Sequence, residues 1–169
     1  MISFRRLGRG DLPLLRRWLS EPHVDAWWHQ PLDLAGLEAK YGPRIDGREP
    51  THVYVIALGE RPVGWIQWYR WSDYPEHAAR LGAQPDTAGL DLAIGEPDLL
   101  GLGLGPRAIC AFVEQVVFTE PSIAACVSDP EERNVRSLRA FEKAGFVSVR
   151  TVVLPGEEAP RRVVRVERP

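Results

Sequence analysis

Three glycines alternate with leucines in the segment Gly101-Leu102-Gly103-Leu104-Gly105, and Pro106 follows directly. Because glycine has no Cβ, such a loop lets a bulky ligand come close to the backbone. Pro106 suits the first turn of a helix, where its missing N–H group costs nothing. The free N–H groups and the dipole at a helix start favour an anion, typically a phosphate. The loop therefore predicts a binding site for a phosphorylated ligand.

Several interpretations of this loop compete. The phosphate loop of nucleotide triphosphatases requires Gly-Lys-Ser/Thr, whereas Gly105 is followed here by Pro106 and Arg107, which excludes it. The dinucleotide fingerprint requires G-x-G-x-x-G, and Gly101 and Gly103 fit its start. The residues that follow fit it poorly, and the loop lies late in the chain. Two interpretations stay open at this point: a loop for the pyrophosphate of coenzyme A, and a flexible connector.

Acidic and aromatic side chains provide further candidates for chemistry. Asp91 lies among apolar residues in Gly89-Leu90-Asp91-Leu92-Ala93-Ile94, where a carboxylate is unusual enough to need a reason. It either takes part in function or faces solvent from a half-buried strand. Asp129, just before Pro130, is either a ligand contact or a turn residue. The pair Trp27-Trp28 belongs either to the core or to an exposed aromatic wall that can contact a sugar or a cation.

Hydrophobic patterning places these residues on a mixed α/β domain with six or seven strands and helices on both faces. Strands are expected over residues 2–5, 52–58, 62–71, 90–94, 123–127, 146–154 and 162–166. Helices are expected over residues 12–19 with Asp11 as cap, over 33–41 with Leu34 and Leu37 facing inward, over 106–118 and over 134–144. Gly42-Pro43 should stop the second helix, and the polar residues 72–86 predict a loop.

Length and composition set the class of protein. With 169 residues, the chain is expected to form a single domain over residues 1–169. The net charge of −2 argues against non-specific nucleic-acid binding and is compatible with a cationic substrate. Cys110 and Cys126 are expected to be reduced core thiols of a cytoplasmic protein, since neither a signal peptide nor a long apolar run is present. The four histidines show no ligand spacing, so no metal is expected.

Two motifs in this order resemble the GNAT superfamily of N-acetyltransferases. One is the glycine loop, and the other is the helix sequence NVRSLRAFEKAGF from Asn134 to Phe146, which fits N-x-x-(A/S)-x-x-x-(Y/F)-E-K-x-G-F. The resemblance implies a mixed, mostly antiparallel sheet of six to seven strands flanked by about four helices. It also implies acetyl-CoA as acetyl donor, bound by Ala93, Ile94, Gly101, Leu102, Gly103, Leu104, Gly105, Asn134 and Phe141. Asn134 would hydrogen-bond the pantetheine arm, although it could equally cap its helix.

A closer resemblance covers most of the chain. Val24-Asp25-Ala26-Trp27-Trp28, Gly64-Trp65-Ile66-Gln67-Trp68-Tyr69, Gly89-Leu90-Asp91 and Asp129-Pro130 are together similar to motifs of the aminoglycoside 6′-N-acetyltransferases. What this implies is a catalytic role for Asp91 as general base or amine anchor. It further implies a substrate cleft lined by Trp28, Gln67, Tyr69 and Asp129.

Two departures from the family pattern matter. Leu99 and Leu100 stand where the pyrophosphate loop usually opens with Gln or Arg, so a side-chain donor is lost and backbone donors remain. Phe141 stands where the family usually has a Tyr that protonates the leaving thiolate. A water or another hydroxyl such as that of Tyr69 must then serve, or the thiolate leaves unaided, which its acidity allows, with a reference pKa of about 8.5 for a thiol.

The resulting hypothesis is direct transfer of an acetyl group to the 6′-amine of an aminoglycoside in a ternary complex, an activity of the antibiotic-resistance type. An alkyl amine with a pKa of about 10.4 is neutral in about one molecule in 2,500 at pH 7, a deficit of about 4.6 kcal/mol that a carboxylate base relieves. The alternatives are another amine (a siderophore-precursor lysine, a polyamine or a protein N-terminus) and a non-catalytic acyl-CoA-binding module. The chain would bind neither nucleic acid nor a membrane, and would be a monomer or a homodimer.

Overall fold

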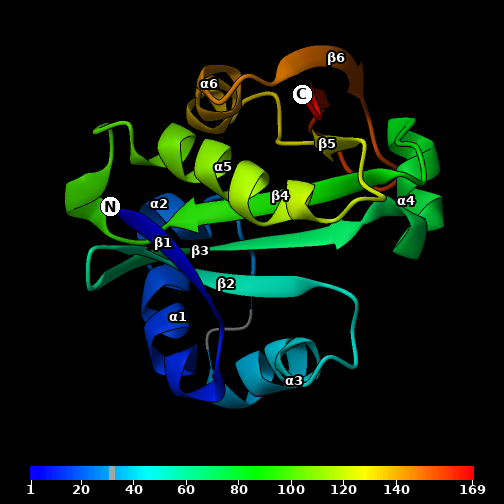
Figure 1. Cartoon of the computed structure of the whole chain (residues 1–169). Helices are drawn as coiled ribbons and strands as arrows, with labels where there is room; N and C mark the ends of the chain where they lie inside the picture. The colour runs from blue at the N-terminus through cyan, green and yellow to red at the C-terminus, as the bar shows by residue number, and fades with distance from the viewer. Residues whose placement is uncertain (31–32) are drawn as a thin grey trace. The chain divides into compact units, whose positions relative to one another are not determined.

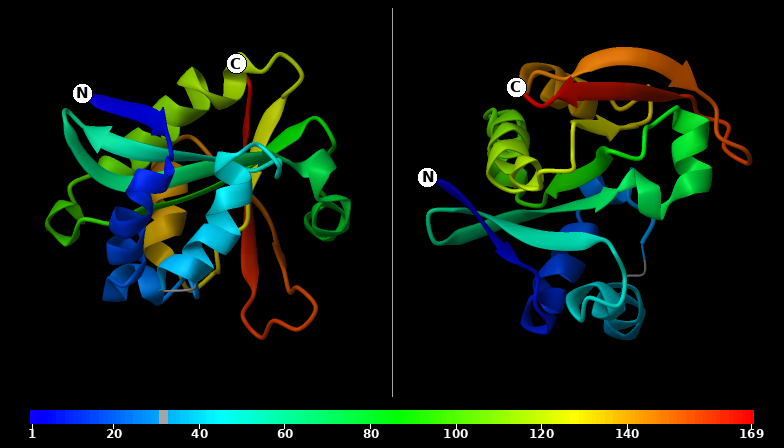
Figure 2. Two further views of the ribbon diagram at one scale, coloured as in Figure 1. Left: turned by 90° about the horizontal axis from the view of Figure 1, so that it is seen from below. Right: turned by 45° about the vertical axis from the view of Figure 1, so that its right-hand side comes forward.

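The computed structural model of the chain describes residues 1–30 and 33–169, and it contains a seven-stranded mixed sheet with the order β1-β2-β3-β4-β5-β7-β6 (Figures 1 and 2). The strands are β1 (Ile2–Arg6), β2 (His52–Leu58), β3 (Arg61–Arg70), β4 (Thr87–Ile94), β5 (Ala125–Ser128), β6 (Val147–Val152) and β7 (Arg161–Glu167). β1 pairs with β2, β5 with β7 and β6 with β7 in antiparallel fashion, whereas β4 pairs with β5 in parallel. The predicted mixed α/β fold with six or seven strands is confirmed.

Six α-helices lie in the described part of the chain, where about four were expected. They are α1 (Leu12–Leu19), α2 (Pro22–Asp25), α3 (Leu34–Ile45), α4 (Pro75–Leu81), α5 (Leu104–Gln115) and α6 (Val135–Lys143). The short 3-10 helices are η1 (Arg9–Asp11), η2 (Trp71–Asp73), η3 (Pro97–Leu99) and η4 (Val117–Thr119). None of the helices in residues 1–30 and 33–169 combines the length and the apolar character that crossing a membrane requires.

The chain forms two compact units. Unit 1 consists of residues 1–67 and 91–104, and unit 2 of residues 68–90 and 105–169. The boundaries fall inside β3, β4 and α5, so these three elements contribute residues to both units. The assignment of residues 1–169 to a single domain stays a prediction.

The core of unit 1 forms where α1 and α3 lie on one side of β2 (Figure 1). On α1, Leu12, Leu15, Trp18 and Leu19 are all buried, as their helical spacing predicts. The indole of Trp18 stacks on that of Trp65 from β3, with ring centroids 6.3 Å apart. Asp11 precedes α1 but does not cap it with its side chain as predicted. Its carboxylate instead accepts hydrogen bonds from Arg5, at 2.7 Å for each oxygen.

Helix α3 continues through Pro43 to Ile45, so the predicted stop at Gly42-Pro43 is wrong. The amide of Asp46 donates to the carbonyl of Gly42 at 2.9 Å, which keeps the last turn helical. The guanidinium of Arg9 connects residues before and after Pro43. It donates to Glu38 at 2.8 Å and to Asp46 at 2.7 Å. These tertiary contacts offset the helix-breaking effect of proline. Leu34, expected to face inward, is 45% exposed.

Unit 2 has a core of Trp71, Ala78, Leu81, Val127, Leu154 and Val163. The segment 72–86 contains α4, so the predicted loop is wrong there. Pro75 starts this helix in a favourable position, Gly82 ends it with a positive φ of 69°, and only two of its residues are buried. Two apolar positions are too few to produce a visible period, which explains why the helix was not predicted.

The remaining elements of unit 2 follow the predicted pattern closely. β6 and β7 form a hairpin, which Figure 2 shows most clearly in its right-hand view. The parallel pairing of β4 and β5 joins Thr87 to Ala125 and Ala88 to Cys126, and two residues later the hydroxyl of Ser128 donates to the carbonyl of Leu90 at 2.7 Å. Cys126 is buried as expected, but Cys110 is exposed on α5.

Candidate functional site

Two of the predicted site residues of unit 1 contact each other directly. The side-chain nitrogen Nε2 of Gln67 donates a hydrogen bond to Oδ2 of Asp91 at 2.9 Å. Gln67 comes from β3 and is 7% exposed, and Asp91 comes from β4 and is half-buried. The carboxylate is therefore held in a defined orientation by a buried amide, as a proton acceptor at a reaction centre requires.

The same amide has a second charged partner that sequence reasoning missed. Nη1 of Arg44 donates to Oε1 of Gln67 at 3.2 Å, while its Nε donates to Oε2 of Glu49 at 3.1 Å. The guanidinium also lies 5.4 Å from the ring centroid of Tyr41. Arg44 lies in the last turn of α3, beyond the point at which the sequence predicts that the helix ends, so no pattern pointed to it.

Tyr41 contributes a buried hydroxyl to the same region. Burial raises the pKa of Tyr41 to about 12, and the negative charge of Asp91 acts in the same direction while Arg44 opposes it. Among the residues that the structure describes, the hydroxyl oxygen of Tyr41 is buried and has no hydrogen-bond partner. At neutral pH this phenol is therefore protonated, and it is a donor rather than a base.

Trp28 is half-buried against the core of unit 1, where its ring packs edge-on to that of Trp65 with a centroid distance of 5.3 Å. Its neighbour Trp27 is also half-buried. The pair therefore matches neither of the two alternatives fully, since it is neither enclosed in the core nor entirely exposed. A contact between Trp28 and a substrate stays a prediction.

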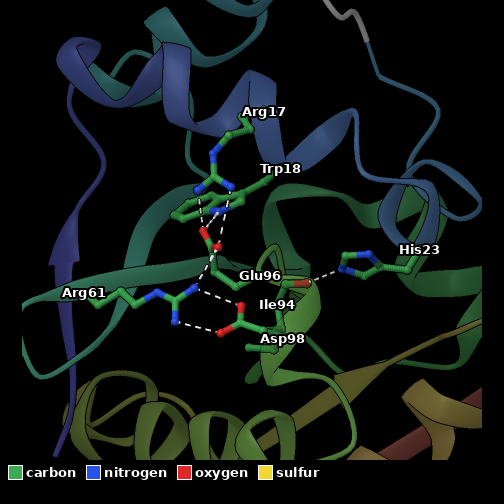
Figure 3. Close-up of polar contacts among 7 residues, drawn as sticks. All are labelled: Arg17, Trp18, His23, Arg61, Ile94, Glu96 and Asp98. Carbon is green, nitrogen blue, oxygen red and sulfur yellow. Dashed lines mark hydrogen bonds and ion pairs between the residues drawn. The ribbon is translucent and has the colours of Figure 1, made fainter.

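The end of β4 carries the predicted cofactor contacts Ala93 and Ile94. A Cβ added to Gly64 of β3 would come within 2.2 Å of the carbonyl oxygen of Ala93, so these backbones approach as closely as only glycine permits. The carbonyl oxygen of Ile94 lies 2.8 Å from Nε2 of His23 (Figure 3). Because a carbonyl can only accept, His23 carries a hydrogen on Nε2.

The buried carboxylate of Glu96 anchors the segment between β4 and the glycine loop (Figure 3). It accepts hydrogen bonds from Nε1 of Trp18 at 2.8 Å, from Arg61 at 3.0 Å and from Arg17. Arg61 in turn makes a two-point contact with Asp98, at 2.8 and 2.9 Å. The Arg17 guanidinium, followed by Trp18 and Arg61, holds the pKa of Glu96 below its ordinary value. The sequence Gly95-Glu96-Pro97 is typical of a turn, so it did not indicate that Glu96 has basic partners.

Two residues of the glycine loop have backbone conformations that favour glycine. Gly101 and Gly103 have φ angles of 77° and 75°, and a Cβ at either position would meet no atom within 4 Å. Leu102 is 67% exposed, whereas Leu104 is buried and begins α5, two residues before the predicted start at Pro106. An open backbone that leads into a helix is compatible with an anion, and binding of the pyrophosphate by this loop stays a prediction.

In unit 2, Asp129 is 8% exposed and is already paired with two basic side chains. Nε2 of His77 lies 3.2 Å and Nη1 of Arg161 3.6 Å from Oδ2 of Asp129. Arg161 also donates to the backbone carbonyl of Asp129 at 3.1 Å and to Glu157. The ring of His77 stacks on that of Trp71, with centroids 5.2 Å apart. His77 lies on α4, which the sequence did not predict, so its contact with Asp129 was not foreseen.

The other predicted residues of unit 2 have well-defined surroundings. The ring of Tyr69 contacts Trp71 and Tyr74 edge-on, each at a centroid distance of 5.1 Å. A Cβ at Gly89 would lie 2.2 Å from this ring, which explains the glycine in the Gly-Leu-Asp motif.

Helix α6 carries the last two predicted cofactor contacts. Oδ1 of Asn134 accepts from the amide of Ser137 at 3.1 Å, so Asn134 caps α6 and its contact with a ligand stays a prediction. Phe141 is 3% exposed and packs edge-on against Phe146 at 4.9 Å, so its ring supports the packing of this helix. A Cβ added to Gly105 would lie 3.7 Å from the Cβ of Ala140, the residue before Phe141. The first turn of α5 therefore lies beside α6.

Residues 8–154 match the family model described as the acetyltransferase (GNAT) domain. The chain belongs to the GNAT family of acetyltransferases. It is accordingly an N-acetyltransferase that uses acetyl-CoA as its acetyl donor, which confirms the predicted enzyme class and cofactor. Family membership favours catalysis over the alternative of a non-catalytic acyl-CoA-binding module.

Relatives within the GNAT family include aminoglycoside N(6′)-acetyltransferase type 1 of Klebsiella pneumoniae, which is 29% identical over 157 residues, or 91% of this chain and 78% of that protein. The crystal structure of aminoglycoside acetyltransferase AAC(6′)-Ib with coenzyme A and kanamycin matches with a TM-score of 0.83 at 29% identity, over 99% of this chain and 95% of the other. The lysine N-acyltransferase MbtK of Mycolicibacterium paratuberculosis is 26% identical over 136 residues, or 80% of this chain and 61% of that protein.

No group of three or more His, Cys, Asp and Glu side chains lies in a position to hold a metal ion in residues 1–30 and 33–169 of this GNAT enzyme. That the enzyme needs no metal stays a prediction.

Proposed function

We propose that this enzyme acetylates the 6′-amine of an aminoglycoside by direct transfer in a ternary complex, as an activity of the antibiotic-resistance type. The observation that carries the proposal is the contact of Gln67 with Asp91, which orients a half-buried carboxylate on β4. The relatives named as aminoglycoside 6′-N-acetyltransferases, and the AAC(6′)-Ib structure that contains kanamycin, support this class of acceptor.

Asp91 would act on the proton of the acceptor ammonium. An alkyl amine is almost fully protonated at pH 7, and forming the neutral, reactive amine costs about 4.6 kcal/mol. The carboxylate attracts the ammonium, accepts its proton and passes the proton to water, so the amine nitrogen keeps a lone pair for attack. General-base assistance of this kind contributes about 10²–10⁴-fold in rate. Bound acetyl-CoA supplies the acetyl group as an activated thioester.

The acceptor itself would be bound by the aromatic and acidic side chains that the resemblance implies. Trp28 and Tyr69 offer ring faces or edges for a sugar and for a cation. Asp129 offers a carboxylate whose charge is partly balanced by Arg161, and whose Oδ2 lies 3.2 Å from Nε2 of His77. The amide of Gln67 is already engaged with Asp91, so it would contribute mainly by orienting this carboxylate toward the reacting amine.

Acetyl-CoA would be held mainly by backbone groups of the glycine loop and of β4. The candidates are those that the resemblance implies: Ala93, Ile94, Gly101, Leu102, Gly103, Leu104 and Gly105, together with Asn134 and Phe141. The open, positive-φ backbone at Gly101 and Gly103 supports this assignment. Because Phe141 has no proton to give, we propose that the thiolate leaves unaided or takes a proton from water or from Tyr69.

A second candidate acceptor is a lysine derivative of the kind used in siderophore assembly. Two relatives favour it: the lysine N-acyltransferase MbtK, and N(6)-hydroxylysine O-acetyltransferase of Escherichia coli, which is 25% identical over 169 residues. Free lysine carries a carboxylate besides its two amines, whereas an aminoglycoside carries several ammonium groups and no carboxylate. The two classes therefore differ in the charge that they present beyond the reacting amine.

Release of the coenzyme A thiol from acetyl-CoA tests the proposal. The panel contains kanamycin, tobramycin, lysine, N6-hydroxylysine and spermidine, together with an aminoglycoside that bears a hydroxyl in place of the 6′-amine. We expect release with kanamycin and tobramycin and only background release with the 6′-hydroxyl compound. Background release with both aminoglycosides, combined with clear release for another amine, would overturn the proposed acceptor.

A further inference from the structure

Gln67 lies between two charged groups of opposite sign. Its Nε2 donates to Asp91 at 2.9 Å, and its Oε1 accepts from Nη1 of Arg44 at 3.2 Å. We propose that Arg44 is a positioning residue for Asp91, because it holds the carboxamide of Gln67 in the one orientation that supports the carboxylate. This inference rests on the proposed role of Asp91 as the proton acceptor.

The argument follows from what each group can donate and accept. A guanidinium has five N–H donors and no acceptor, and an ionised carboxylate has only acceptors. A side-chain amide has one end of each kind, and the two ends are almost identical in shape. If the carboxamide of Gln67 turned over, its oxygen would face the Asp91 carboxylate and its NH₂ group would face Arg44. Both contacts would then be repulsive, so Arg44 excludes the flipped amide.

Arg44 is itself held in place. Its Nε donates to Oε2 of Glu49 at 3.1 Å, its guanidinium lies over the ring of Tyr41, and its side chain is 17% exposed. It stands in the turn of α3 that follows Pro43, so the unexpected continuation of this helix is what places the cation beside Gln67. In such sheltered surroundings, charge-assisted hydrogen bonds are stronger than neutral ones and polarise their neighbours.

The experiment is a double-mutant cycle between Arg44 and Gln67. Arg44→Met removes the charge and the donors at similar length, and Gln67→Leu removes the amide. We expect Arg44→Met to lower kcat/KM for the acceptor about tenfold and to leave the dissociation constant of acetyl-CoA within about twofold. In the Gln67→Leu background the same substitution should change kcat/KM by less than about twofold, because the group through which Arg44 acts is gone.

Two further variants separate positioning from folding. Arg44→Lys keeps a donor-only cation, so we expect it to lose less than about threefold in kcat/KM. Arg48→Met removes a nearby exposed arginine, 65% exposed and paired with Asp46, and should leave kcat/KM unchanged. If Arg44→Met fails to fold, as a thermal scan would reveal, the cycle of Arg44→Gln with Gln67→Leu replaces it, because Gln also removes the positive charge.

The outcomes distinguish this inference from the proposed function. If Asp91→Asn abolishes turnover but the effect of Arg44→Met is absent, or is equally large in the Gln67→Leu background, the role of Arg44 is wrong and the proposed function stands. If Asp91→Asn keeps full turnover, the proposed function fails and this inference fails with it. An Arg44→Met loss that disappears when Gln67 is replaced supports both.

Discussion

Oδ2 of Asp91 accepts a hydrogen bond from Nε2 of Gln67 at 2.9 Å, between neighbouring strands β3 and β4. The contact has a functional implication because an amide that donates to a carboxylate stabilises its ionised form. It also orients Oδ2 of the carboxylate. A base that is oriented before substrate arrives needs less rearrangement during the reaction.

Replacing Asp91 by Asn tests the base directly. The substitution preserves size but removes the group that accepts a proton, so we expect kcat to fall by about 10²–10⁴-fold at pH 7. Binding of coenzyme A, measured by calorimetry, should change by less than about twofold. A variant that lost coenzyme A binding as well would instead indicate a structural role. A kcat within threefold of the wild type would contradict the assignment.

The glycine loop can be tested with a pair of matched substitutions. Gly103→Val forces a β-branched residue into a φ of 75°, where a non-glycine residue loses about 1–3 kcal/mol, so the backbone donors must shift. Gly156→Val creates the same conflict at a φ of 81° in the turn between β6 and β7. We expect coenzyme A affinity to fall more than tenfold for the first variant and less than twofold for the second.

A nearby charge change provides the second control for the loop. Arg107 is exposed on the first turn of α5, and Arg107→Gln should reduce coenzyme A affinity less than Gly103→Val does. The reason is that a site built from backbone donors depends on loop conformation more than on one side-chain charge. A larger loss for Arg107→Gln than for Gly103→Val would show that side-chain charge dominates the binding of the pyrophosphate.

Glu96 should make the stability of the protein depend on pH. Hydrogen bonds from Arg17, Trp18 and Arg61 lower its pKa in the folded state below its ordinary value. The stabilisation is therefore complete above the pKa of the unfolded chain and is lost as the pH falls through the lower pKa of the folded protein. We expect Glu96→Gln to reduce the free energy of unfolding by about 1–3 kcal/mol at pH 7, with a smaller difference once the pH has fallen through the pKa of the folded state.

Urea unfolding at a series of pH values measures this effect. Glu60→Gln, at an exposed position in the turn between β2 and β3, serves as the control and should follow the wild type at every pH. A constant difference between wild type and Glu96→Gln from pH 3 to pH 7 would mean that the network stabilises through packing alone.

Asp129 should affect acceptor affinity more than turnover. Asp129→Asn leaves Arg161 and His77 without their carboxylate partner, so the local charge becomes more positive. We expect KM for a polycationic acceptor to rise about tenfold, with kcat at saturation nearly unchanged, and the rise to shrink at high salt. Asp73→Asn removes an exposed carboxylate from η2 and tests long-range charge. An equal rise in KM for both variants would show that Asp129 makes no specific contact.

Local patterns of apolar residues were sufficient for most of the fold. The near-continuous apolar run over residues 52–58 and the run that follows its turn predicted β2 and β3, and the apolar faces of α1, α5 and α6 predicted three helices. The failures occurred where tertiary contacts override local preference. The contacts of Arg9 stabilise the turn of α3 beyond Pro43, and α4 forms with only two buried side chains. Neither cause is visible in a local window of sequence.

The candidate site was predictable only in part. Asp91 and Gln67 were identified as residues, through a resemblance and through an unusual carboxylate in a strand, but their contact depends on the pairing of β3 with β4. Arg44, His77 and Glu96 gave no signal, since their partners lie 23, 52 and 78 residues away along the chain. Isolated charged residues on helices and turns are mostly solvated, so a sequence offers no reason to select them.

The carboxylate of Glu96 also has a kinetic implication. Its partners Arg17, Trp18 and Arg61 are 79, 78 and 35 residues away, so each contact can form only after a long stretch of chain has closed. Loop closure of this kind is entropically unfavourable and slows the formation of non-local contacts. We therefore expect the turn that precedes the glycine loop to become ordered late in folding. The backbone that would receive acetyl-CoA would then be among the last parts of the chain to reach its native conformation.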